Sequence, residues 1–407
     1  MTASGKQNLL FIIDFNHEYL SPFVSSVANE ANLFFLNYAY PSEVKSRSFE
    51  AFGTIVFWTA FKNADDLIKK LKPSKVIFFE LETLNQVALN VACKKHDIPT
   101  VFCDHGLQDI KIIAALNKTP GFRPTESKIN RLKGVFEKGI INVLRNKRFF
   151  QQSISKNSEA EQDFLKKYQT IRLSNSIFHT YQKINDPLLY PDAYYCFSEK
   201  NYEYHRYLNH DQDLPVHYFG IPEYDGYELI EGNLTAQDVL YIDQPYCHFG
   251  YYGWTESNKI AWLQQLQKVC NKKQRKLFIK KHPRETDIWD QLPEAHFIGN
   301  DLYQHMKNIG VVLGFNSTLL MPLAALDHTA LFCFRHHPNG STNQTAIFVE
   351  AGVAQWIEDL DSVGQSLEEV AQIRSRQQIN KSKFITQWMH RFDGQSSKRL
   401  KELLLSS

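Results

Sequence analysis

The sequence lacks several features that would assign it to a familiar class of protein. Its six cysteines include no C-x-x-C pair, and several lie inside apolar runs, so neither a disulfide framework nor a zinc site is expected. No uninterrupted apolar run approaches the roughly 20 residues of a membrane-spanning helix. The N-terminus has no basic region followed by an apolar core, as a signal peptide would. We therefore expect a cytoplasmic protein with buried free thiols and no metal.

A charge excess and the motifs of the large enzyme classes are also missing. The 46 Lys and Arg residues nearly balance the 44 Asp and Glu residues, and this disfavours a nucleic-acid partner. None of the motifs G-x-x-x-x-G-K-S/T, G-x-G-x-x-G, H-E-x-x-H and G-x-S-x-G is present. Common nucleotide hydrolases, dinucleotide oxidoreductases, zinc proteases and serine hydrolases are therefore disfavoured.

What the sequence contains is an α/β pattern. Its 407 residues fit two or three domains. Short apolar runs alternate with amphipathic helical stretches in two separate regions, which is typical of parallel sheets covered on both faces. We predict two doubly wound, Rossmann-like domains facing each other across a cleft, with a linker near 225–237. The expected strands are 9–13, 54–58, 75–79, 100–103, 193–197, 216–219, 239–243, 276–280, 296–298, 310–313 and 330–334.

Polar segments follow three of the strands expected in the second domain. The strand at 276–280 ends in Lys280-Lys281-His282-Pro283-Arg284, whose cations could bind a phosphate or form a solvated basic turn. The strand at 310–313 is followed by Asn316-Ser317-Thr318 and a helix expected from Leu319, which could bind an anion or be a plain helix cap. Because ligands bind at the carboxyl ends of strands in such sheets, these ends together suggest a diphosphate or a nucleotide monophosphate.

The third segment is Gln244-Pro245, which follows the strand at 239–243 and precedes an aromatic loop, 248–254. Gln244 could recognise a base or a sugar and the aromatic side chains could stack on it, or the loop could be a hydrophobic cover. In the first domain, Asp104-His105-Gly106 ends a buried strand and could supply a general base. Asp104 could instead cap the next segment, and Glu80 and Glu82 are rival carboxylates.

A basic stretch at 128–148 carries apolar residues at roughly helical spacing. Such a cationic amphipathic element could lie on an anionic membrane. An ordinary helix with a solvated basic face is the interpretation we favour slightly.

Taken in order, these segments resemble bacterial GT-B glycosyltransferases of surface polysaccharide assembly. The run at 280–285 resembles the HP motif of GT-B sialyltransferases, Kdo transferases and the glycerophosphotransferases of teichoic acid synthesis, and 316–318 resembles their serine/threonine phosphate motif. Gln244-Pro245 resembles the Q-P of capsule Kdo-type enzymes, and 197–199 and 220–225 resemble segments that close the first domain. Sialyltransferases carry two acidic residues before the glycine where this chain has Asp104-His105-Gly106, whereas the glycerophosphotransferases carry His-Gly there.

The resemblance implies an acceptor-binding domain at 1–230, a nucleotide-sugar-binding domain at 238–375, and a C-terminal helical segment, 376–407, that packs back on the first domain. It also implies a metal-independent glycosyltransferase that needs no cofactor beyond a donor such as CMP-Kdo or a CMP-sialic-type sugar. The acceptor would be a lipopolysaccharide, capsule or lipid-linked glycan. By resemblance, the catalytic residues are Asp104, His105 and His282, and the donor-binding residues are Gln244, Pro245, Lys281, His282, Pro283, Arg284, Asn316, Ser317 and Thr318.

Other functions stay open on the sequence. A CDP-linked polyol-phosphate transferase of teichoic-acid type fits the same motifs. A GT-B-fold sugar-nucleotide epimerase or hydrolase, or a non-catalytic nucleotide- or glycan-binding protein, would share the architecture. A cytoplasmic location at the inner face of the bacterial inner membrane would suit the glycan acceptors.

Overall fold

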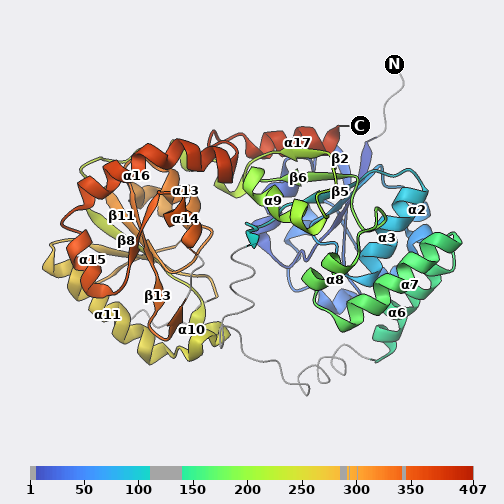
Figure 1. Cartoon of the computed structure of the whole chain (residues 1–407), viewed down its shortest axis with the longest axis horizontal. Helices are drawn as coiled ribbons and strands as arrows, with labels where there is room; N and C mark the ends of the chain where they lie inside the picture. Colours follow the sequence, from blue (N-terminus) through green and yellow to red (C-terminus); the bar gives the residue numbers. More distant parts are fainter. Residues whose placement is uncertain are drawn as a thin grey trace. The chain divides into compact units, whose positions relative to one another are not determined.

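The computed structural model describes residues 6–110, 140–284, 291–292, 294–299, 301–341 and 345–406 (Figure 1). The chain forms two compact units. Among the described residues, unit 1 contains 6–107, 140–223 and 395–406, and unit 2 contains most of the chain between Tyr224 and Gly394.

Unit 1 is built on a seven-stranded parallel sheet with the strand order β3-β2-β1-β4-β5-β6-β7. Side chains alternate between its two faces, as the pleat requires. Val76 and Phe78 join the apolar core under α2, α3 and α6, whereas Lys75 points to the other face and reaches α17. The strands are β1 (Gln7–Ile12), β2 (Ala31–Tyr38), β3 (Thr54–Phe57), β4 (Lys75–Phe78), β5 (Thr100–Cys103), β6 (Ala193–Cys196) and β7 (Val216–Tyr218).

Helices cover both faces of this sheet (Figure 1). They are α1 (Ser21–Ser25), α2 (Ala64–Leu71), α3 (Leu84–Lys95), α6 (Ile140–Ile154), α7 (Glu159–Ser174), α8 (Ile177–Lys183), α9 (Glu199–Leu208) and α17 (Ser396–Leu405). The buried ammonium of Lys75 donates to the carbonyls of Leu403, Leu404 and Ser406 at 3.0, 3.3 and 2.8 Å. These bonds satisfy carbonyls that the end of α17 leaves without helical partners. The expected packing of the C-terminal helix on the first domain is therefore confirmed.

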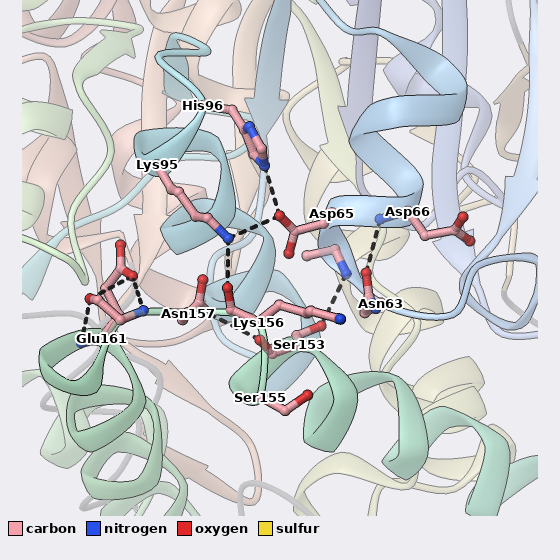
Figure 2. Close-up of polar contacts among 12 residues, drawn as sticks. Asn63, Asp65, Asp66, Lys95, His96, Ser153, Ser155, Lys156, Asn157 and Glu161 are labelled. Atoms are coloured by element: carbon pink, nitrogen blue, oxygen red, sulfur yellow. Dashed lines mark hydrogen bonds and ion pairs between the residues drawn. The ribbon is translucent and has the colours of Figure 1, made fainter.

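A polar cluster joins α2, α3 and the turn between α6 and α7 (Figure 2). The carboxylate of Asp65 lies 2.7 Å from Nε2 of His96 and 3.1 Å from Nζ of Lys95. Lys95 also donates to the carbonyl of Lys156 at 2.6 Å. Burial raises the pKa of Asp65, but the hydrogen bonds and charges of His96 and Lys95 outweigh burial and lower it overall.

Unit 2 is built on a six-stranded parallel sheet with the order β10-β9-β8-β11-β12-β15. Its strands are β8 (Asp238–Ile242), β9 (Leu277–Lys280), β10 (His296–Ile298), β11 (Ile309–Gly314), β12 (Ala330–Phe334) and β15 (Ala354–Ile357), and a small hairpin pairs β13 (His336–His337) with β14 (Gly340–Ser341). The helices are α10 (Tyr246–Phe249), α11 (Glu256–Lys272), α12 (Leu302–His305), α13 (Leu320–Ala325), α14 (Ala346–Glu350), α15 (Leu360–Ser366) and α16 (Val370–Phe384), which continues as a π-helix over Ile385–Met389.

The two parallel sheets covered by helices confirm the predicted α/β, GT-B class. The chain passes back to unit 1 at 395, later than the expected boundary at 376, because α16 packs on β12 and α13 of unit 2. No described helix is both long and apolar enough to cross a membrane.

Candidate active site

The strand order of unit 2 brings the three expected donor-binding segments to neighbouring strand ends. β8 lies between β9 and β11, so the segments that begin at Asp243, Lys281 and Phe315 leave the same edge of the sheet. Adjacent strands are about 4.8 Å apart, so the ends of β9 and β11 are separated by roughly 10 Å. From β8, the chain adds β9 and β10 on one side of the sheet and then β11, β12 and β15 on the other, so the strand order reverses between β8 and β11. Doubly wound sheets bind ligands at such switch points.

Gln244 is held by a buried ion pair at the end of β8. Asp243 and Lys259 have fully buried side chains, and Nζ of Lys259 lies 2.7 Å from Oδ1 of Asp243. The same ammonium donates to the carbonyl of Gln244 at 3.3 Å. Lys259, on α11, therefore fixes the backbone from which the Gln244 side chain projects, and Pro245 behind it is buried.

The segment after β11 is tied to the aromatic loop after β8. The hydroxyl of the buried Tyr246 donates to Oδ1 of Asn316. Oγ of Ser317 accepts from the amide of Leu319 at 3.2 Å, one residue before α13 begins. The N-cap of α13 is Leu319, which makes no side-chain cap, so the expected side-chain cap is not formed, and the helix is shorter than the one expected from Leu319 to 327. Tyr224 donates to the carbonyl of Thr318 at 2.6 Å. These bonds fix the backbone of the Asn316-Ser317-Thr318 turn at the end of β11.

The basic segment after β9 has a defined geometry up to Arg284. The amide of Arg284 donates to Nδ1 of His282 at 3.1 Å, so in this geometry Nδ1 is the unprotonated nitrogen of a neutral imidazole and Nε2 carries the hydrogen. Pro283 and Arg284 are exposed and His282 is half-buried. The ammonium of Lys281 lies 4.8 Å from the ring centroid of Phe297 on β10, a cation–π distance.

The carboxyl edge of unit 1 carries a second set of titratable groups. His105 follows β5, and its ring meets that of Phe79 edge-on, with centroids 6.0 Å apart. Burial lowers the pKa of His105, Asp104 opposes this, and His205 and His17 lower it further. An imidazole with this pKa is neutral at pH 7 and can accept a proton.

Carboxylates from the neighbouring strand ends surround this edge. Glu80 follows β4, and burial, Glu82 and Asp14 all raise its pKa. Burial also raises the pKa of Glu82, which Arg172 opposes. Asp14 follows β1, with one carboxylate oxygen 3.6 Å from Nε2 of His17. Sequence reasoning named the two glutamates but not Asp14 or His17, although the polar end of the first strand was visible in the sequence.

The side chain of Asp104 lies in a buried hydrogen-bonded network, which favours the alternative that it is a satisfied carboxylate over a direct role as the base. Its side chain is 1% exposed. Oδ1 lies 2.7 Å from Nε2 of His205, and Oδ2 accepts from the amide of Phe197 and from Nδ2 of Asn201, both at 2.9 Å. A carboxylate that is fully hydrogen-bonded to protein groups cannot reach a substrate hydroxyl.

Asp104, Cys196 and His205 are also the one group of possible metal ligands within the described part of the chain, with ligand atoms within 4.8 Å of one another. Burial and the charge of Asp104 raise the pKa of the Cys196 thiol well above its ordinary value. A metal would need the thiolate and would displace the hydrogen bonds that Asp104 already accepts. The group therefore fits a hydrogen-bonded network better than a metal site.

A family model described as Alpha-2,8-polysialyltransferase (POLYST) matches residues 46–334. The chain belongs to this polysialyltransferase family. The family match spans both units and every predicted site residue from Asp104 to Thr318. No curated protein matches the chain.

Solved glycosyltransferases share the fold of this polysialyltransferase-family protein. The calicheamicin glycosyltransferase CalG4 is similar with a TM-score of 0.52 at 11% identity, over 98% of each chain. The wall teichoic acid polymerase TagF gives 0.51 at 10% identity, over 98% of this chain and 87% of that one. UGT89C1 of Arabidopsis thaliana, complexed with UDP, gives 0.50 at 11% identity, over 98% and 99%. Family and fold together make the chain a GT-B glycosyltransferase, as the resemblance implied.

Proposed function

We propose that this glycosyltransferase transfers a sialic-acid-type sugar from a CMP-activated donor to a hydroxyl of a growing capsule or lipopolysaccharide glycan. The observation that carries the proposal is the convergence of the His282, Gln244 and Ser317 segments on adjacent strand ends at the switch point of unit 2. The family description favours sialic acid over Kdo as the sugar. The donor is therefore assigned to unit 2.

In the proposed reaction the bond between the anomeric carbon and the CMP phosphate breaks while a bond to the acceptor oxygen forms. The phosphate gains negative charge as it leaves. His282 through Nε2–H, the hydroxyls of Ser317 and Thr318, and the cations of Lys281 and Arg284 offset that charge. Such preorganised donors supply the stabilisation without a metal or a further cofactor, and transfer in the presence of EDTA is the expected result.

The acceptor hydroxyl loses its proton as it attacks, and we assign His105 as the base that takes it. Its half-buried imidazole is neutral at pH 7 because burial lowers its pKa. The rate of transfer should therefore fall only when the pH drops below the pKa of an ordinary histidine, which is about 6.5.

The test is a donor panel with purified protein and an oligosialic acceptor. CMP-sialic acid, CMP-Kdo, CDP-glycerol and a UDP-sugar are supplied separately, and nucleotide release and product length are measured with and without acceptor. We expect acceptor-dependent CMP release from CMP-sialic acid, and a loss of about 100-fold or more in His282→Ala. His217→Ala, at an exposed histidine on β7, is the matched control.

Other outcomes of the panel identify other functions. Turnover of CDP-glycerol would establish a polyol-phosphate transferase. The His105-Gly106 pair resembles the His-Gly of the glycerophosphotransferases. Donor consumption without acceptor would indicate an epimerase or hydrolase, and tight nucleotide binding without turnover would indicate a binding protein. Each of these results would contradict the proposed transfer.

We further propose that the protein acts in the cytoplasm at the inner face of the bacterial inner membrane and contacts anionic lipid through α6. Ile141 and Leu144 are 68% and 58% exposed there, beside the exposed cations of Arg145, Lys147 and Arg148. Exposed apolar side chains next to cations suit the surface of an anionic bilayer. The remainder of the predicted basic element, 128–139, lies outside the described residues.

Sedimentation with vesicles tests the lipid contact. The wild type should sediment with vesicles that contain about one-third phosphatidylglycerol and much less with neutral vesicles, because the attraction is electrostatic. Ile141→Ser/Leu144→Ser should weaken the interaction, whereas Leu173→Ser, at a 73% exposed leucine on α7, should not. Equal sedimentation of the wild type with both vesicle types would contradict the proposal.

A further inference from the structure

The residues on either side of His105 are both hydrogen-bonded by the buried side-chain amide of Asn201. Nδ2 of Asn201 donates to Oδ2 of Asp104 at 2.9 Å and to the carbonyl of Gly106 at 3.0 Å. Both hydrogens of that nitrogen are thereby used, one on each side of His105. We propose that Asn201 is a positioning residue that sets the orientation of His105 for proton transfer. The inference rests on the proposed function, in which His105 is the base.

Asn201 is itself rigidly placed. It lies in the first turn of α9, it is fully buried, and its amide donates to Oγ of Ser198, the N-cap of that helix. The carboxylate of Asp104 is equally fixed, because Oδ1 is hydrogen-bonded to His205 and Oδ2 also accepts from the backbone amide of Phe197. The side-chain amide of Asn201 therefore ties the carbonyl of Gly106 to two fixed elements, α9 and the end of β5.

The second acceptor of the Asn201 side chain is the carbonyl of Gly106. The surroundings of Gly106 are open, because a Cβ added there would meet nothing within 4 Å. Among the residues that the structure describes, the hydrogen bonds that reach the 104–106 turn from beyond β5 come from α9, from Tyr195 of β6 and from Phe197 directly after it, and the Asn201 bond to Gly106 is the one that lies beyond His105. Without it, the turn can rotate His105 away from Phe79. A misplacement of about 1 Å in a reacting group is enough to cost roughly 100-fold in rate.

We expect the same bond to influence how far the imidazole is shielded from water, because it holds the turn that carries His105. The titratable groups that act on His105 are Asp104 beside it, His205 on α9 and His17 after β1. Burial is the largest influence, and it lowers the pKa. Release of the Gly106 carbonyl should expose the ring, so its pKa should rise toward the ordinary value of about 6.5.

The experiment compares Asn201→Ala with the wild type by NMR titration of the His105 ring, assigned with His105→Gln. Asn209→Ala is the control, because Asn209 is also fully buried and lies at the other end of α9. We expect the His105 pKa to rise in Asn201→Ala and to stay unchanged in Asn209→Ala. With donor and acceptor, kcat of Asn201→Ala should fall about 10- to 100-fold while the KM for the donor is unchanged.

The NMR comparison separates this inference from the proposed function. If the His105 ring of Asn201→Ala titrates as in the wild type, the positioning role is refuted, whatever the transfer assay shows. If the wild type transfers no sugar, the proposed function fails, and the titration still decides whether Asn201 places the ring. Asn201→Ser, which is too short to reach Gly106, replaces Asn201→Ala in the same comparison if the alanine variant does not fold.

Discussion

Lys259→Met should destabilise unit 2 strongly, because it leaves a buried carboxylate without its cation. Asp243 and Lys259 are both fully buried, 2.7 Å apart, and the same ammonium also holds the carbonyl of Gln244. Removal of one member of a buried ion pair costs about 3–5 kcal/mol, since the remaining charge keeps its desolvation penalty and loses its partner. For a unit of this size, that corresponds to a fall in Tm of roughly 6–20 °C.

Urea unfolding followed by the fluorescence of Trp254 and Trp262 measures this loss, since both indoles lie in the same aromatic cluster of unit 2. Lys268→Met, at an exposed lysine on the same helix, should change the unfolding free energy by less than about 0.5 kcal/mol. Asp243→Leu/Lys259→Met removes both charges and should recover most of the loss. A cost below about 1 kcal/mol for Lys259→Met, or no recovery in the double variant, would refute the reasoning.

Three further predictions follow from the described contacts. Lys75→Met should destabilise unit 1 by about 2–3 kcal/mol and speed amide exchange in α17, because three carbonyls lose a charged donor; unchanged exchange would argue against the tie. Because the folded pKa of Asp65 is lowered, its ion pairs stabilise the protein above about pH 4 and are lost as the pH falls further, so the stability difference between the wild type and Asp65→Asn should shrink below that pH in acid unfolding curves. His105→Glu should retain part of the transfer activity and move the acid limb of its pH profile to lower pH, because a carboxylate loses its proton at lower pH than an imidazole; complete loss of transfer at every pH would contradict its role as the base.

The alternation of apolar and polar residues was sufficient to predict most strands of both sheets. β5, β10 and β12 have the predicted bounds, β1 starts two residues earlier and ends one residue earlier than expected, and the other expected strands differ by one residue at one or both ends. Two strands were missed. β2 contains Asn32 and Asn37, which weaken a strand signal, and β15 is a four-residue edge strand that starts directly after a glycine-containing turn.

The three segments that we propose bind the donor could be recognised in the sequence because each follows a strand directly. Once the sheet is doubly wound, the chain order alone places β8 between β9 and β11, so local patterns become neighbours in space. Lys259 could not be found in the same way. Lys259 lies on the buried face of α11 together with Leu263 and Leu266. From sequence alone, a lysine at such a position would be assigned to the solvent-exposed face, and only the fold shows that it pairs with Asp243.

The sequence could not choose between Asp104 and His105 as the base for a related reason. Asp104 and His105 are adjacent, so no sequence pattern distinguishes a buried carboxylate from a reactive imidazole. The distinction is made almost 100 residues later, where α9 supplies Asn201 and His205 and uses every accessible oxygen of Asp104. Asp104 is therefore bound into a buried network, whereas His105 beside it is only half-buried.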